Sequence, residues 1–135
     1  MFLRKTQIRM SFIVDNVSFI GDNKVLQKRW AIYYKDSKSG REPAKEWIAS
    51  LKDKMGKAKI MARIARAEVG NFGKWRSVGD GVFELKIDYG PGYRIYYALD
   101  GNEVILLLVG GDKSTQSRDI SLAKELWMSH KREEK

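Results

Sequence analysis

Residues 79–97 read GDGVFELKIDYGPGYRIYY, and this stretch decides the fold. Apolar and polar residues alternate along 82–88 and again along 93–99, which is the period of a β-strand with one face in a core. The Tyr-Gly-Pro-Gly sequence between the two arms supplies turn residues. The stretch therefore predicts a β-hairpin with its turn near Gly90. A shift of one residue would reverse the faces of both arms, so the pattern also determines the register.

This register places two cations opposite each other. With the turn near Gly90, Lys86 lies opposite Arg94, and Glu84 lies opposite Tyr96. Like charges on neighbouring strands repel unless an anion lies between them, so this polar face is the first candidate for an anionic partner. The other face carries apolar residues and should pack on the core. These are Phe83, Leu85, Ile87, Tyr93, Ile95 and Tyr97.

Composition narrows the classes of function. The chain has 135 residues, enough for one compact domain, and its 26 Lys and Arg against 17 Asp and Glu give a net charge of +9. Such an excess favours a polyanionic partner: nucleic acid, an acidic protein or an anionic membrane. The absence of cysteine excludes disulfides and thiol catalysis, and a single histidine, His130, excludes a histidine-based metal cluster. No apolar run approaches membrane-spanning length. We expect a soluble, cytoplasmic protein without a cofactor.

Two helices are predicted before the hairpin. Residues 29–34 are β-prone and end in a polar loop. Pro43 then suits the first turn of a helix, because proline lacks the N–H that this turn leaves unpaired. A second helix is predicted to follow Gly56 and to stop at Gly70.

The segments around and after the hairpin complete the expected fold. Residues 71–78 are predicted to be a connection. Residues 103–109 are apolar at consecutive positions, which indicates a strand covered on both sides. A last helix is expected over 115–130. The order β-α-α-β-β-β-α predicts an α+β domain, with a mainly antiparallel sheet and helices packed on its apolar face.

Residues 1–26 lack a readable core pattern. We interpret them as an N-terminal extension of unclear role, either an optional segment, a mobile tail or an added edge strand. The folded domain is predicted to span residues 27–135.

The cationic face suits one chemistry in particular, the cleavage of RNA by its own 2′-OH. The protein then has to align that hydroxyl with the adjacent phosphate, move protons and stabilise the added negative charge. Arg94 is the candidate phosphate ligand, since guanidinium is always charged and can fork onto two oxygens. Lys86 could do the same or act as a base. Lys113 could complete the clamp, and Asp119 is a candidate proton acceptor.

Each of these residues also has a structural interpretation. Lys86 can pair with Glu84 or Asp88, and Arg94 can pair with Asp88, all on the same face of the hairpin. Asp119 can simply stabilise the N-terminus of the last helix, where a negative charge is favourable.

Further residues are candidates for binding RNA. Lys74 and Arg76 flank Trp75, and a ring between two cations can stack on a base while the cations meet phosphate. Trp75 can equally be half-buried packing. Tyr96 and Gln116 are the other two candidates.

Four segments of the chain resemble a known family of proteins. The segments ELKIDYGPGYRIYY and LLLVGGDKSTQSRDISLAKELW, with EPAKEWIASLKD and GKAKIMARIARAEVGNFG upstream, resemble the RelE/ParE superfamily of type II toxins. The resemblance covers about residues 29–127 and is closest to the HigB-like, phage-derived addiction module killers. It implies a compact RelE-like α+β toxin and a cognate antitoxin, often a helix-turn-helix protein. For RelE and HigB members it also implies cleavage of mRNA in the ribosomal A site without a metal.

The resemblance carries over to individual residues in part. Lys86 matches a catalytic lysine, Arg94 matches the phosphate-binding arginine of a Gly-Tyr-Arg motif, and Lys113 falls where RelE has a cation. Asp119 stands where RelE has a tyrosine, and Glu84 replaces another lysine. Two alternatives therefore stay open: a ParE-like, non-nucleolytic inhibitor of DNA gyrase, and a nucleic-acid-binding relative without activity.

Overall fold

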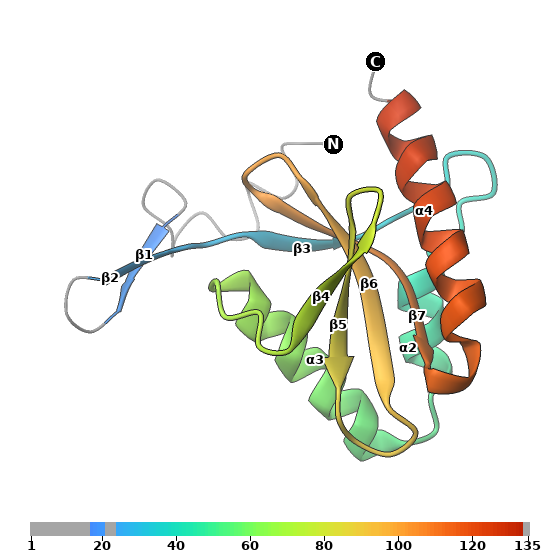
Figure 1. The fold of residues 1–135 in the computed structure, drawn as a ribbon, viewed down its shortest axis with the longest axis horizontal. Coiled ribbons are helices and arrows are strands. Elements are labelled where there is room, and N and C mark those ends of the chain that lie inside the picture. The colour runs from blue at the N-terminus through green and yellow to red at the C-terminus, as the bar shows by residue number, and fades with distance from the viewer. Residues whose placement is uncertain (1–16, 21–23, 134–135) are drawn as a thin grey trace.

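The computed structural model describes residues 17–20 and 24–133. Figure 1 shows the helices and strands, coloured in their order along the chain. Their bounds are β1 (Val17–Ile20), β2 (Lys24–Gln27), β3 (Trp30–Tyr33), α2 (Pro43–Ser50), α3 (Lys54–Glu68), β4 (Trp75–Gly79), β5 (Val82–Ile87), β6 (Tyr93–Asp100), β7 (Val104–Asp112), the short 3₁₀ helix η2 (Lys113–Thr115) and α4 (Gln116–Glu133).

Five strands form the central sheet in the order β3-β7-β6-β5-β4. The pair β3–β7 is parallel and the other three pairs are antiparallel. The predicted α+β class with a mainly antiparallel sheet is confirmed, and so is the meander β5-β6-β7. Strand β7 is buried along most of its length between β3 and β6, as the apolar run predicted.

The hairpin β5–β6 has the register that the sequence predicts. Lys86 pairs with Arg94, and Glu84 pairs with Tyr96. The turn contains Gly90 with φ of 56° and Gly92 with φ of 82°, a backbone conformation that glycine adopts without strain. The apolar side of the hairpin packs against α2 and α3 in one core cluster.

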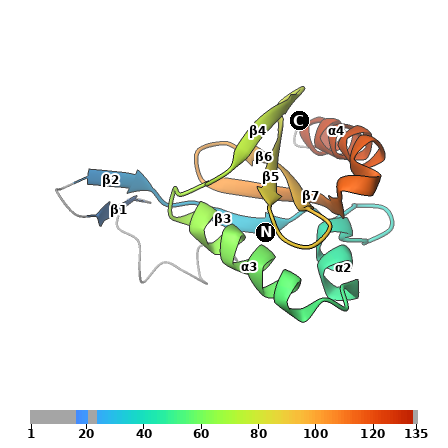
Figure 2. The same cartoon turned by 60° about the horizontal axis from the view of Figure 1, so that its bottom comes forward.

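The last helix, α4, lies on the face of the sheet opposite to the one that we expected. We expected all helices on one face of the sheet, but α2 and α3 cover one face and α4 covers the other (Figure 2). Alternate residues of β6 and β7 build a second apolar face, which includes Tyr96, Ala98 and Leu106, and Ala123 and Trp127 of α4 pack on it. A strand that is apolar at consecutive positions needs a covering layer on both sides.

Strand β4 corrects the predicted connection over residues 71–78. Trp75–Gly79 pairs antiparallel with β5 and forms one edge of the sheet. Its residues are mostly exposed, so it shows no apolar alternation by which a strand would be recognised.

Helix α3 begins two residues before Gly56 and not after it. Asp53 caps the helix by accepting from the Gly56 N–H at 2.9 Å, and its carboxylate also accepts from the Tyr93 hydroxyl at 2.7 Å. A Cβ on Gly56 would collide with both side chains, so glycine is required inside the helix. This contact ties the start of α3 to the hairpin. The helix ends before Gly70, as predicted.

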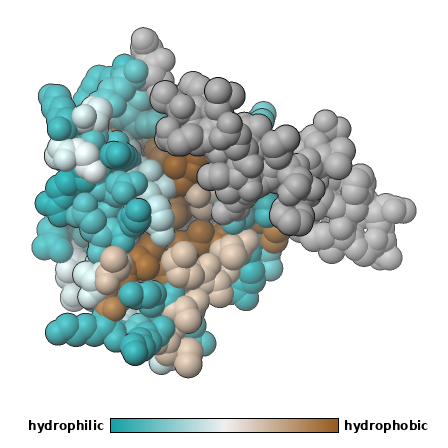
Figure 3. All heavy atoms as spheres, turned by 180° about the vertical axis from the view of Figure 1, so that it is seen from behind, coloured by the Kyte–Doolittle hydropathy of each residue, from teal (hydrophilic) through white to brown (hydrophobic). Residues whose placement is uncertain are grey.

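The first two strands lie outside the central sheet. β1 and β2 pair antiparallel in a two-stranded sheet of their own, which projects to one side in Figure 1. Residues 1–16 of the predicted extension lie outside the described residues. On the back of the molecule, the coloured part of the surface in Figure 3 is hydrophilic toward its periphery, and apolar residues gather near the centre.

Candidate functional site

Two adjoining cavities open on the side of β5 and β6 that carries Lys86 and Arg94, and they share these two residues. Their volumes are about 420 and 410 Å³. We call them together the cationic hollow. One part is lined by Lys74, Trp75, Arg76, Glu84, Lys86, Arg94 and Gln116, and the other by Lys86, Asp88, Tyr89, Gly90, Pro91, Gly92, Arg94 and Lys113. Five cations against two carboxylates leave an excess of three positive charges, which attracts an anion.

Arg94 forms the floor of the cationic hollow. Its side chain is 5% exposed, and Nη1 donates to the Gly92 carbonyl oxygen at 2.8 Å. Nε lies 3.5 Å from Glu84 Oε2 but is buried without a hydrogen-bond partner among the residues that the structure describes. The sequence predicted a more exposed arginine. The hairpin register is as predicted, but the face of the hairpin on which Arg94 lies is covered.

Glu84 is the buried counter-ion of the cationic hollow, with a side chain 2% exposed. It accepts from Arg76 Nε and from Gln116 Nε2, each at 2.9 Å. Burial alone would raise the pKa of Glu84, but these two hydrogen bonds and the charges of Arg76 and Arg94 outweigh it and hold the pKa below its usual range. Glu84 is therefore ionised at neutral pH.

Lys74, Lys86 and Asp88 form the rim. Lys74 Nζ lies 2.7 Å from Asp88 Oδ2, and Lys86 Nζ lies 3.6 Å from Asp88 Oδ1. The hydrogen bond from Lys74 is the largest influence on the pKa of Asp88 and lowers it, against the opposing effect of burial. Asp88 and Lys74 are both more than half exposed, so an incoming anion can displace this carboxylate.

Six of the eight predicted residues thus line the cationic hollow. Lys113 is exposed in η2, and Gln116 at the start of α4 reaches Glu84. The other two predicted residues, Tyr96 and Asp119, do not line the cationic hollow. Tyr96 is completely buried under α4, so it cannot contact RNA in this conformation. Asp119 is 5% exposed, accepts a hydrogen bond from Thr115 Oγ1 and lies against the backbone of Gly111. The burial of both residues follows from the position of α4.

Arg63 of α3 is a supporting residue that sequence analysis missed. It is 9% exposed, and its guanidinium donates to the carbonyl oxygens of Lys86, Phe72 and Lys74. It thereby holds the backbone at two rim cations. Burial lowers the pKa of Arg63, but an arginine stays charged. The sequence offered no signal for this role, because Arg63 lies among several basic residues of α3.

Comparison with known proteins places the chain in a family. The family model described as "Phage derived protein Gp49-like (DUF891)" matches residues 46–127. This chain belongs to the Gp49-like family. The matched range contains every residue of the cationic hollow. The family is that of RelE/HigB-like addiction module killers and suggests a phage-derived toxin of a toxin–antitoxin module.

A relative of this Gp49-like chain comes from Haemophilus influenzae (strain ATCC 51907 / DSM 11121 / KW20 / Rd). It is 54% identical over 80 residues, which cover 59% of this chain and 81% of the relative, and it is described as an uncharacterized protein.

The side chain of Trp75 is partly packed and partly exposed. Its side chain is 52% exposed, yet its ring lies 5.8 Å from that of Phe83 in an edge-to-face contact. Trp75 lines the cationic hollow. It also lines a separate small apolar cavity of about 210 Å³, whose other lining residues are Phe72, Phe83, Tyr97 and Leu99. The Gp49-like chain thus has an exposed aromatic ring next to its cations.

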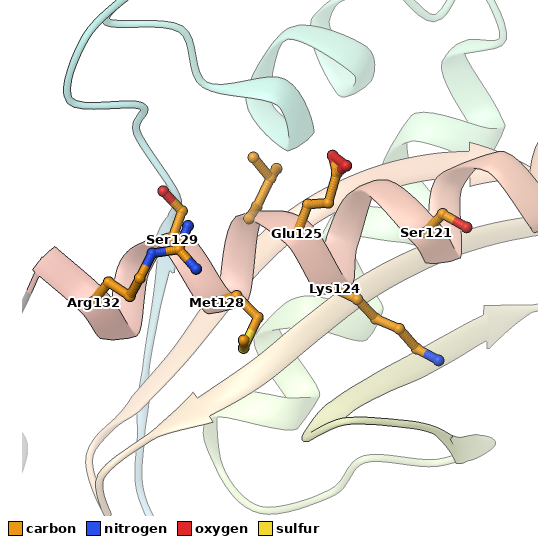
Figure 4. A pocket seen from close by; sticks show the side chains of 7 residues that line it. Ser121, Lys124, Glu125, Met128, Ser129 and Arg132 are labelled. Atoms are coloured by element: carbon orange, nitrogen blue, oxygen red, sulfur yellow. The ribbon is translucent and has the colours of Figure 1, made fainter.

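A groove of about 600 Å³, larger than either of the two cavities of the cationic hollow, runs along the outer side of α4 (Figure 4). The side chains of Lys124 and Met128 point to one side of the helix, while Glu125 points to the other (Figure 4). The polar groups do not converge on one point, and the groove shares no lining residue with the cationic hollow. Convergent chemistry, not size, therefore identifies the candidate site.

Among residues 17–20 and 24–133, no group of three His, Cys, Asp or Glu side chains is placed to hold a metal ion. Within the same ranges, no helix has the length and apolar character needed to cross a membrane.

Proposed function

We propose that this Gp49-like protein is the toxin of a type II toxin–antitoxin system and cleaves mRNA on the ribosome. The observation that carries the proposal is the cationic hollow. Lys86 faces Arg94 across β5 and β6, with Arg76 on one side and Lys113 on the other. An RNA phosphate placed between these side chains would relieve their mutual repulsion.

The proposed reaction is a transesterification within the RNA. The 2′-oxygen attacks the adjacent phosphorus, the bond from phosphorus to the 5′-oxygen breaks, and a 2′,3′-cyclic phosphate forms. The 2′-OH loses a proton to a base and the leaving 5′-oxygen gains one. Arg94 stabilises the charge on the phosphate oxygens, with Lys113 beside it. Lys86 is the proposed proton carrier, since Asp119 is buried away from the hollow.

The remaining cations and the polar amide would hold the RNA strand. Lys74 and Arg76 are exposed and would contact flanking phosphates, while Gln116 lines the cationic hollow next to Glu84. The excess of positive charge also suits an antitoxin segment that is acidic or covers the cationic hollow. We propose such an antitoxin, often a helix-turn-helix protein in this family, as the second partner.

Induced expression in cells tests the proposal. We expect growth arrest and mRNA fragments whose new ends map within codons, and the purified protein should cut mRNA on programmed ribosomes. Lys86→Ala should abolish the fragments. Lys124→Ala is the matched control, because it removes the same charge from α4 outside the hollow.

Three results would contradict the proposal. Altered DNA supercoiling without mRNA fragments would indicate a gyrase inhibitor instead. Growth without arrest when the chain is expressed alone would exclude the toxin. RNA binding without cleavage would indicate an inactive relative.

A further inference from the structure

The cationic hollow contains a buried anion of its own, the carboxylate of Glu84. All three of its partners line the hollow and come from different elements: Arg76 from β4, Arg94 from β6 and Gln116 from α4. The distances from Glu84 oxygens are 2.9 Å to Arg76 Nε, 2.9 Å to Gln116 Nε2 and 3.5 Å to Arg94 Nε. Glu84 thus occupies the position from which an anion reaches both arginines.

The two arginines depend on this carboxylate for their positions. Arg76 is 55% exposed, and its guanidinium approaches both Glu84 oxygens, at 2.9 and 3.4 Å. Among the residues that the structure describes, the Arg94 side chain donates one hydrogen bond, to the Gly92 carbonyl oxygen, and its Nε lies 3.5 Å from Glu84 Oε2. Without a negative charge between them, the two guanidinium groups would repel each other and separate.

We propose that Glu84 is a positioning residue for RNA cleavage, an internal counter-ion that holds Arg94 and Arg76 in place and thereby weakens the affinity of the hollow for phosphate. This inference rests on the proposed function. The lowered pKa of Glu84 agrees with it, because the carboxylate stays charged at neutral pH.

The proposal predicts that turnover and affinity change in opposite directions. Glu84→Gln keeps the shape of the side chain and raises the excess of positive charge in the hollow. Binding of a phosphate should become at least threefold tighter, since one repulsive charge is gone. Turnover should fall at least tenfold, because Arg94 is no longer held where the transition state needs it. A residue that only stabilised the fold would not tighten binding.

Asp88 offers a matched control for charge. Asp88→Asn adds the same charge to the hollow, but Asp88 is exposed and pairs with Lys74 and Lys86, not with the arginines. We expect a similar gain in phosphate affinity and a smaller loss of turnover than in Glu84→Gln. Glu84→Asp is the second variant, since it keeps the charge and draws the carboxylate away from the arginines. Its affinity should stay as in the wild type and its turnover should fall.

The experiment uses the full chain and two independent measurements. Binding is measured with a short single-stranded RNA in which every 2′-OH is replaced by fluorine, so that it cannot be cleaved. Turnover and half-saturation are measured on mRNA in programmed ribosomes, and thermal unfolding checks that each variant is folded.

The outcomes separate this inference from the proposed function. Unchanged or weaker RNA binding by Glu84→Gln would overturn it, and so would equal turnover in Glu84→Gln and Asp88→Asn. If Glu84→Gln does not fold, wild-type turnover in Glu84→Asp would overturn it. A wild-type protein that binds the RNA but cleaves no mRNA would refute the nuclease proposal, and the binding comparison would still show whether Glu84 limits affinity.

Discussion

Two charged residues of the cationic hollow are more deeply buried than the sequence pattern suggests. Arg94 and Glu84 lie on the face that the hairpin register predicts, but they are 5% and 2% exposed. An ion pair at this depth is not the weak surface pair that alternation alone suggests. Removing one partner leaves the other charge buried, so function and stability are coupled at this site.

Arg94→Ala should therefore affect both properties. We expect cleavage to fall at least a hundredfold, since one cation at a developing charge contributes a few kcal/mol. We also expect a loss of about 1–3 kcal/mol in the free energy of unfolding, because Glu84 loses a charged partner. Arg94→Lys keeps the charge but cannot fork onto phosphate, so it should lose activity with less loss of stability. Single-turnover cleavage and chemical denaturation measure the two effects, and wild-type cleavage by folded Arg94→Lys would contradict this role.

At the scale of elements, the edge strand β4 depends on a contact from α3. Arg63 donates to carbonyl oxygens at Phe72, Lys74 and Lys86, which lie before β4 and within β5. The strand has few buried side chains of its own. A buried charged donor shared between three carbonyls is thus a main attachment of this edge.

Arg63→Ala should destabilise the protein by about 3 kcal/mol, because buried carbonyl oxygens lose a charged donor. Amide hydrogen exchange should become faster along β4 in particular. Arg66→Ala is the control, since Arg66 lies on the exposed side of the same helix. Equal protection of β4 in the two variants would show that Arg63 does not hold the strand.

At the scale of the whole molecule, helices enclose the central sheet on both faces. Several carboxylates are held by donors from other elements, among them Asp53 at the start of α3 and Glu84 in the cationic hollow. Hydrogen bonds from the Gly56 N–H and the Tyr93 hydroxyl lower the pKa of Asp53 against a smaller effect of burial. The pKa of Glu84 is lowered as well.

The stability should therefore fall in acid. A carboxyl whose pKa is lower in the folded than in the unfolded state stabilises the fold above its unfolded pKa. That contribution is lost as the pH falls through the folded value. We expect the melting temperature to decline below about pH 4.5, near the ordinary pKa of glutamate. Glu84→Gln should decline less between pH 6 and pH 3, as followed by circular dichroism, and an equal decline would show that Glu84 does not contribute.

The extension over residues 1–26 is predicted to be dispensable. β1 and β2 form a separate two-stranded sheet, whereas β3 pairs with β7 in the central sheet. A chain that starts near Gln27 should unfold cooperatively and bind RNA as the full chain does. Calorimetry and RNA titration test this, and loss of cooperative unfolding would show that the extension belongs to the domain.

The sequence by itself determined the features that depend on local periodicity and turn chemistry. The alternation along residues 82–99 and the glycines of the turn established the hairpin and placed Lys86 opposite Arg94. Pro43 marked the start of α2, and the apolar run of β7 indicated cover on both sides. Side chains repeat with a fixed period in strands and helices, so these features can be read within one segment.

Only the tertiary structure decided which of the polar residues are accessible. The position of α4 buried Tyr96 and Asp119, and the pairing of β4 brought Arg76 to Glu84. The partners of Glu84 come from three elements, and Gln116 lies 32 residues away in the chain. Burial and charge pairing depend on which distant segments pack together, and no local pattern contains that information.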